Sequence, residues 1–100
     1  MKTNLTRGNI EISITLTNDS EIRKLNKKFL NKDYATDVLS FNIDQELEHG
    51  KYYLGDVIVN VEQAERQAGE YGNTLEQEIA ALVEHGVLHL LGVHHDGDDH

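Results

Sequence analysis

The chain has 100 residues, about the size of one globular domain, and with 38% hydrophobic and 27% charged residues it resembles ordered rather than disordered proteins. Its formal net charge of −9 argues against a protein that coats nucleic acid, because such binding depends largely on Lys and Arg contacts to phosphates. No apolar run approaches the ~18 residues of a membrane span and the N-terminus is too polar for a secretory signal, so we expect one cytoplasmic domain over residues 1–100, without a membrane partner.

The first part of the chain predicts a strand followed by a helix. Apolar and polar residues alternate over residues 9–16, which is the pattern of a half-buried strand. Asn18 and Glu21 form a capping-box-like start, and Ile22 and Phe29 mark one face of a helix that ends at about residue 29 or 30. A local basic surface is possible here, because five of the nine basic residues lie on or just past this helix: Arg23, Lys24, Lys27, Lys28 and Lys32.

The middle of the chain predicts two short strands and a second helix. Residues 38–41 and residues 54–61 are apolar runs typical of buried strands, and we expect the polar segment between them to form a hairpin loop. Residues 62–71 carry apolar side chains at helical spacing, and Gly72 suits the left-handed position that follows a helix.

The last predicted helix is the longest. Thr74 and Gln77 form a second capping box, and a broad apolar face continues to a stop at Gly92. The order strand, helix, strand, strand, helix, helix predicts an α+β fold, with a small mixed β-sheet covered by helices. The order of the strands within the sheet does not follow from this pattern.

Five of the six histidines lie in the last sixteen residues, and the chain has no cysteine, so a metal ion would be held by nitrogen and oxygen ligands. His85 and His89 are one helical turn apart, so both imidazoles project from one face. Gly92 lets the chain leave the helix, so that His95, or its close rival His94, can approach the same point. Three imidazoles leave the fourth position of zinc open, as in catalytic sites. We predict one Zn²⁺ bound by His85, His89 and His95 at the end of the longest helix.

The spacing of these histidines is that of a metallopeptidase signature, but one position differs. Where the peptidases carry a glutamate as general base, this chain has Gly86, which has no group to transfer a proton. Glu84 points about 100° away around the helix and is a poor substitute. Glu78 lies on the histidine face two turns earlier, where a solvated or helix-stabilising carboxylate is favoured over a partner of the ligands. Three imidazoles also suit nickel, copper or iron.

Three blocks of the chain match one known family in order and spacing. Residues 85–95, HGVLHLLGVHH, resemble the pattern H-G-x-L-H-L-x-G-Y-D-H, with Val93 and His94 in place of its Tyr and Asp. Residues 25–26, LN, and residues 32–41, KDYATDVLSF, resemble L-N…K-D-x-P-T-D-V-L-S-F, and residues 55–58, GDVI, resemble the start of G-D-[IL]-x-I. With these blocks the chain resembles the YbeY family of bacterial metal-dependent endoribonucleases over most of its length.

The resemblance implies a zinc-dependent, single-strand-selective endoribonuclease of ribosomal RNA maturation, which acts near the 3′ end of small-subunit rRNA and in ribosome quality control. Its partners would be single-stranded RNA and the ribosome, with no DNA expected. The family usually has an arginine, considered important for RNA cleavage, where this chain has Leu30, and a proline where it has Ala35. Lys27, Lys28 and Lys32 are the candidate RNA-binding residues, although a solvated helix face is the alternative. No general base or acid is identified.

Two alternatives stay open. A non-catalytic, zinc-stabilised domain that binds the ribosome or another protein is favoured somewhat by Leu30 and by the net charge of −9. Another metal-dependent hydrolase would need a general base in the place that Gly86 leaves empty.

Overall fold

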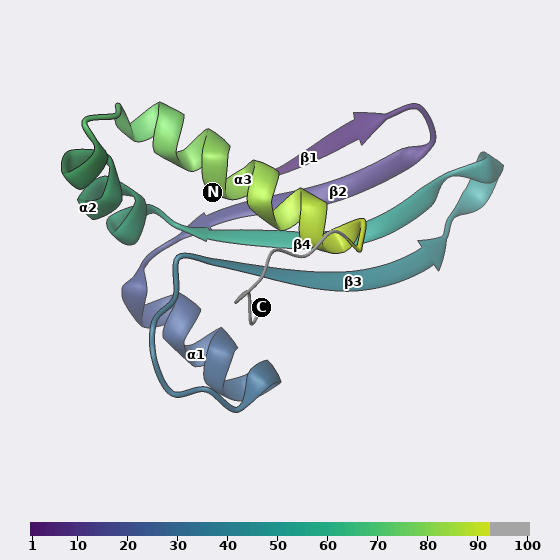
Figure 1. Ribbon diagram of the computed structural model, residues 1–100. Coiled ribbons are helices and arrows are strands. Elements are labelled where there is room, and N and C mark those ends of the chain that lie inside the picture. The colour runs from purple at the N-terminus through teal and green to yellow at the C-terminus, as the bar shows by residue number, and fades with distance from the viewer. Residues whose placement is uncertain (93–100) are drawn as a thin grey trace.

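The computed structural model describes residues 1–92, which form an α+β fold as predicted (Figure 1). The elements in chain order are β1 Lys2–Arg7, β2 Ile10–Thr17, α1 Asp19–Leu30, β3 Val38–Glu46, a short 3-10 turn η1 Glu48–Gly50, β4 Tyr52–Asn60, α2 Val61–Tyr71 and α3 Leu75–Leu90. The longest helix, α3, has 16 residues, and none of the helices that the structure describes has the length and apolar character required to span a bilayer.

The strands form one mixed sheet with the order β1-β2-β4-β3. β2 pairs in parallel with β4, whereas β1 with β2 and β3 with β4 are antiparallel. Helices α2 and α3 lie on one side of the sheet and α1 on the other (Figure 1). The main core fills the space under α2 and α3 and consists of Ile14, Val38, Leu54, Val57, Val59, Ala64, Leu82 and Leu90.

The helix boundaries follow the predicted caps. The side chain of Asn18 accepts a hydrogen bond from the backbone N–H of Glu21 at 2.9 Å. Thr74 and Gln77 form a complete capping box, with bonds of 3.1 and 2.9 Å. Gly72 follows α2 in the left-handed conformation, with φ of 69°. These local signals therefore placed all three helices correctly.

The structure contains more strand than the sequence predicts. β1 was not predicted, because each of its residues is exposed and Leu5 is the only strongly apolar one among them. It pairs with β2 across a turn at Gly8, whose φ is 61°. The expected loop between the middle strands is instead largely strand, since Gln45 pairs with Tyr53 and Glu46 with Tyr52.

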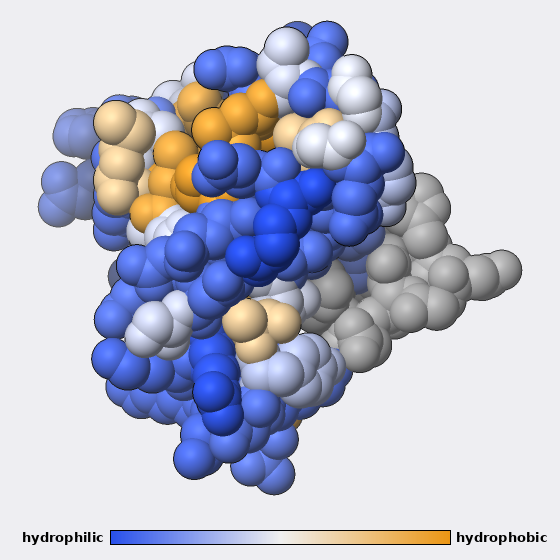
Figure 2. All heavy atoms as spheres, turned by 90° about the vertical axis from the view of Figure 1, so that its left-hand side faces the viewer, coloured by the Kyte–Doolittle hydropathy of each residue, from blue (hydrophilic) through white to orange (hydrophobic). Residues whose placement is uncertain are grey.

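Part of the apolar surface around the core is incompletely covered. In Figure 2 hydrophobic side chains reach the surface in the upper half of the molecule, within a mainly hydrophilic surround. Several partly buried residues pack against the core on the side of the sheet that carries α2 and α3, namely Ile12, Leu16, Tyr52, Leu75, Ile79, Val83 and Val87.

Candidate functional site

His85 and His89 lie one turn apart near the C-terminal end of α3, as predicted. Their ring centroids are 4.7 Å apart, and the ring planes are inclined by 32°. His89 is buried, with 6% exposure, and His85 is half-buried. Adjacent imidazoles held at this spacing suit a divalent ion that prefers nitrogen ligands, such as zinc. Within residues 1–92 no third His, Cys, Asp or Glu completes a metal-binding group; the predicted third ligand, His95, and its rival His94 lie outside the described residues.

At Gly86, between the two histidines, α3 lies directly against the sheet. A Cβ atom at this residue would lie 2.6 Å from Cγ1 of Val57 and 3.0 Å from Oγ of Ser40. The hydroxyl of Ser40 also donates a hydrogen bond of 3.0 Å to the carbonyl of Gly86. A side chain at residue 86 would therefore point into the sheet. Residue 86, where metallopeptidases carry their general base, is therefore packed between helix and sheet in this chain.

The edge strand β3 also holds the end of α3. The side-chain amide of Asn42 donates a hydrogen bond of 2.9 Å to the carbonyl of Leu90, one of the last carbonyls, which have no partner within the helix. Gly92, the predicted end of the helix, then adopts a left-handed conformation with φ of 84°. Two side chains of β3, Ser40 and Asn42, thus fix the segment of α3 that bears the histidines.

The surroundings of the histidines include a shallow hollow of about 230 Å³, lined by Ala81, Glu84, His85 and Leu88. Glu78, on the same helix, does not reach this hollow. Its side chain is buried, with 7% exposure, and accepts a hydrogen bond of 3.3 Å from Asn73 in the preceding turn. The solvated role favoured for Glu78 is therefore wrong, whereas a helix-stabilising role fits a carboxylate in the first turn of α3.

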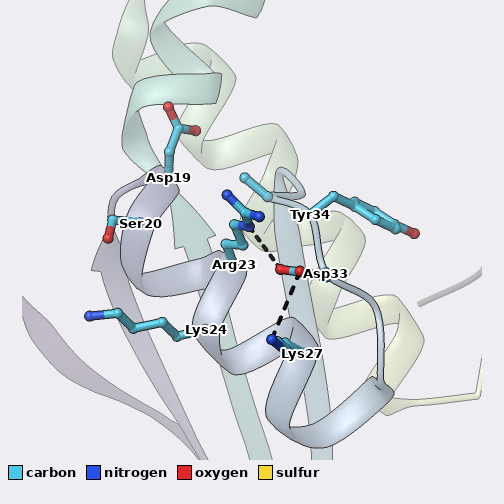
Figure 3. A pocket seen from close by; sticks show the side chains of 8 residues that line it. Asp19, Ser20, Arg23, Lys24, Lys27, Asp33 and Tyr34 are labelled. Carbon is cyan, nitrogen blue, oxygen red and sulfur yellow. Dashed lines mark hydrogen bonds and ion pairs between the residues drawn. The ribbon is translucent and has the colours of Figure 1, made fainter.

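A larger groove, of about 790 Å³, lies between α1 and the segment 33–35 that folds back beside it (Figure 3). In Figure 3 Arg23 and Lys27 converge on Asp33: Nε of Arg23 donates to its carboxylate at 2.9 Å, and Nζ of Lys27 lies 3.9 Å from it. The Arg23 guanidinium lowers the pKa of Asp33, and Asp33 in turn raises the pKa of Arg23. The lining consists of Asp19, Ser20, Arg23, Lys24, Lys27, Asp33, Tyr34 and Ala35.

The three lysines predicted to bind RNA differ in their surroundings. Only Lys27 lines the groove. Nζ of Lys28 lies 5.2 Å from the ring centroid of Phe29, in a cation–π contact, and Lys32 follows the end of α1. Leu30, at the last position of α1, is 38% exposed, so its apolar side chain stands at the surface where the resemblance implies an arginine.

Arg23, Lys24 and Tyr34 line the groove although the sequence did not single them out as site residues. Lys27 lies four residues after Arg23 and three after Lys24, and both spacings make it a neighbour of these residues on one broad face of the helix. That spacing could have identified the cations. The position of Tyr34 could not be identified in this way, because it depends on how the segment after α1 folds back.

Two buried asparagines hold this segment in place. Asn26, 1% exposed, donates a side-chain hydrogen bond of 3.0 Å to the carbonyl of Tyr34. Asn60, which is fully buried, donates one of 3.1 Å to the carbonyl of Thr36. The wall of the groove formed by residues 33–35 therefore lies between two fixed points.

Comparison with known proteins agrees with the motifs around these residues. The family model described as Endoribonuclease YbeY matches residues 1–100. The Endoribonuclease YbeY of Aquifex aeolicus is 49% identical over 89 residues, which cover 89% of this chain and 59% of that protein. The Endoribonuclease YbeY of a Sulfurihydrogenibium species is 46% identical over 95 residues, covering 95% of this chain and 62% of that protein. The chain thus spans about three fifths of the length of these relatives.

A solved structure shows the same fold. The solution structure of TM1509 from Thermotoga maritima is 36% identical to this chain, with a TM-score of 0.55, over 88% of this chain and 55% of that one. The α+β arrangement of the chain therefore agrees with that of this relative. Since the family model matches all of residues 1–100, the chain belongs to the endoribonuclease YbeY family.

Proposed function

We propose that the chain is a zinc-dependent endoribonuclease that cleaves single-stranded ribosomal RNA, near the 3′ end of the small-subunit rRNA, during maturation and ribosome quality control. The observation that carries the proposal is the pair of adjacent imidazoles on α3, with His89 buried, in a chain of this family. His95 is the proposed third ligand. Binding to the ribosome and a cytoplasmic location remain predictions.

In this proposal different residues of the chain bind the ion, hold its ligands in place and bind the phosphates of the RNA. His85 and His89 would hold the ion as neutral imidazoles, at a separation set by one turn of α3. Ser40, Asn42 and the close approach at Gly86 would keep that turn against the sheet, so that both rings stay in place. When bound, zinc lowers the pKa of a water molecule or polarises a phosphodiester. The cations of α1 would bind phosphates away from the reacting bond.

A second candidate function is a non-catalytic, zinc-stabilised domain that binds the ribosome or a protein. Leu30 favours it, because its side chain cannot stabilise negative charge on a phosphate. The net charge of −9 also favours it, since an acidic chain repels RNA except at local basic surfaces.

A paired assay tests the proposal. The purified protein is incubated with single-stranded fragments of rRNA and, in parallel, with a casein substrate. His85→Ala is compared with His49→Asn, a matched change at the exposed turn η1, where asparagine tolerates the left-handed φ of 62°. We expect the wild type and His49→Asn to cleave RNA, His85→Ala to be inactive, and casein to stay intact.

Two other results would redirect the assignment. No RNA cleavage above the His85→Ala level, together with unfolding when zinc is chelated, would support the non-catalytic domain. Hydrolysis of casein without cleavage of RNA would support a different metal-dependent hydrolase.

A further inference from the structure

We propose that the groove between α1 and residues 33–35 binds a segment of single-stranded RNA that flanks the segment at the histidines. The inference rests on the proposed function and extends it, because it assigns RNA contacts to Arg23, Lys24 and Tyr34. These residues would hold the substrate at a distance from the reaction. The groove would thus favour long single-stranded substrates over short ones.

The first observation is the stripe of cations on α1. The side chains of Arg23, Lys24 and Lys27 are 58%, 71% and 66% exposed, so they can reach a ligand without leaving a buried position. Two carboxylates also line the groove. Asp19 is bound by Arg66 of α2 at 2.8 Å, and Asp33 is shared by Arg23 at 2.9 Å and Lys27 at 3.9 Å, so a single carboxylate faces two cations there. Lys24 pairs with Glu21 at 3.3 Å, an exposed ion pair that a phosphate can replace. Exposed cations in a row along a helix suit the successive phosphates of a nucleic-acid backbone.

The second observation is the aromatic ring on the rim. Tyr34 is 49% exposed, and in Figure 3 its ring extends away from α1, on the side of the groove opposite Lys24. Its backbone is anchored by the buried side chain of Asn26. Proteins bind single strands with cations and aromatic rings together, since every base offers a face for stacking, and here a half-exposed ring lies across the groove from the cations. An acidic peptide would match the cations but would leave the ring unused.

The third observation is the place of the groove in the fold. α1 and the histidine helix lie on opposite sides of the sheet (Figure 1). They meet the same edge strand, β3: Phe41 packs against Phe29 of α1, with centroids 5.3 Å apart, while Ser40 and Asn42 bind α3. A strand held in the groove would therefore pass around β3 to reach the histidines. Only an RNA long enough to occupy both places would gain from the groove.

Fluorescence anisotropy with labelled, uncleavable 2′-O-methyl oligonucleotides of about 4 and about 16 nucleotides tests this inference. For the long oligonucleotide, Lys24→Gln should weaken binding and reduce the slope of log K against log salt by about 0.7. Tyr34→Leu should weaken binding about tenfold and leave that slope unchanged. Binding of the short oligonucleotide should not change in either variant. Matched controls are Lys51→Gln and Tyr71→Leu, the same changes at exposed residues elsewhere.

The outcomes separate this inference from the proposed function. If Lys24→Gln and Tyr34→Leu bind the long oligonucleotide as the wild type does, the groove is not an RNA site, although RNA binding stands. If the wild type binds neither oligonucleotide, the proposed function fails as well. If polyglutamate displaces the long oligonucleotide from the wild type and Tyr34→Leu binds RNA normally, the groove fits an acidic peptide and the inference is wrong.

Discussion

At the scale of single residues, Gly86 brings the histidine-bearing turn of α3 against the sheet. The hydrogen atom in place of a side chain lets the backbone of α3 lie against Val57 and Ser40. Both proposed metal ligands of α3 lie close to this contact, because His85 precedes Gly86 and His89 follows it by three residues. The geometry of the two imidazoles therefore depends on a contact to which neither histidine contributes.

We expect Gly86→Ala to destabilise the protein by about 1–3 kcal/mol, because the helix or Val57 must move to admit a methyl group. Gly69→Ala is the matched control: it lies inside α2, where nothing stands within 4 Å of an added Cβ, so it should stabilise by about 0.5–1 kcal/mol. Urea unfolding measures both changes. A Gly86→Ala protein as stable as the wild type would contradict the close packing.

Leu30 bears directly on the proposed RNA cleavage. Its side chain is 38% exposed, so an arginine fits there without burial of charge. If the chain cleaves RNA, Leu30→Arg should raise the single-turnover cleavage rate by about tenfold or more, because it restores the cation that the family resemblance implies at this position. Leu5→Arg adds the same charge at an exposed position of β1 and serves as control. Equal rates in the two variants would refute a role for residue 30.

At the scale of elements, the starts of α1 and α2 are joined by a polar network. Asn60 caps α2, accepting from the backbone of Glu62 at 3.1 Å, and its amide donates to Asp19 at 2.6 Å. Arg66 binds the same carboxylate at 2.8 Å. The hydrogen bonds from Arg66 and then from Asn60 lower the pKa of Asp19. This network fixes α1 against α2 and so fixes one end of the groove.

The lowered pKa of Asp19 makes the stability of the fold depend on pH. Its carboxylate stabilises the folded state above the unfolded pKa of about 3.8, and that stabilisation is lost as the pH falls through the lower folded value. Arg66→Gln should therefore reduce the free energy of unfolding at pH 7, and the reduction should shrink below about pH 4. Urea unfolding across this range measures the difference, with Arg7→Gln on β1 as control for net charge. A reduction that stays constant with pH would contradict the pairing.

The sequence predicts the helices of this chain more completely than its strands. Asn18, Gly72 and Thr74 are local signals, and each acts on the helix next to it in the chain. β1 has no such signal, since its order comes from hydrogen bonds to β2 and not from burial of its own side chains. The extension of β3 likewise depends on pairing with β4. Pairing between strands depends on their register, which periodicity along one strand does not reveal.

At the scale of the whole molecule, the sheet separates two sites. The spacing of His85 and His89 was enough to predict their adjacency, because it lies within one helix. The groove combines α1 with residues 33–35, brought together by Asn26 and Asn60 from 8 and 24 residues away. That arrangement is tertiary, so of the three predicted lysines the groove includes only Lys27.

The zinc that we propose on the histidine helix can be measured by inductively coupled plasma mass spectrometry. The protein is prepared without exposure to nickel resin, and His89→Ala is compared with His49→Asn. We expect one zinc ion per chain in the wild type and in His49→Asn, and almost none in His89→Ala, because a buried ligand is lost. A His89→Ala protein that retains stoichiometric zinc would contradict the assignment.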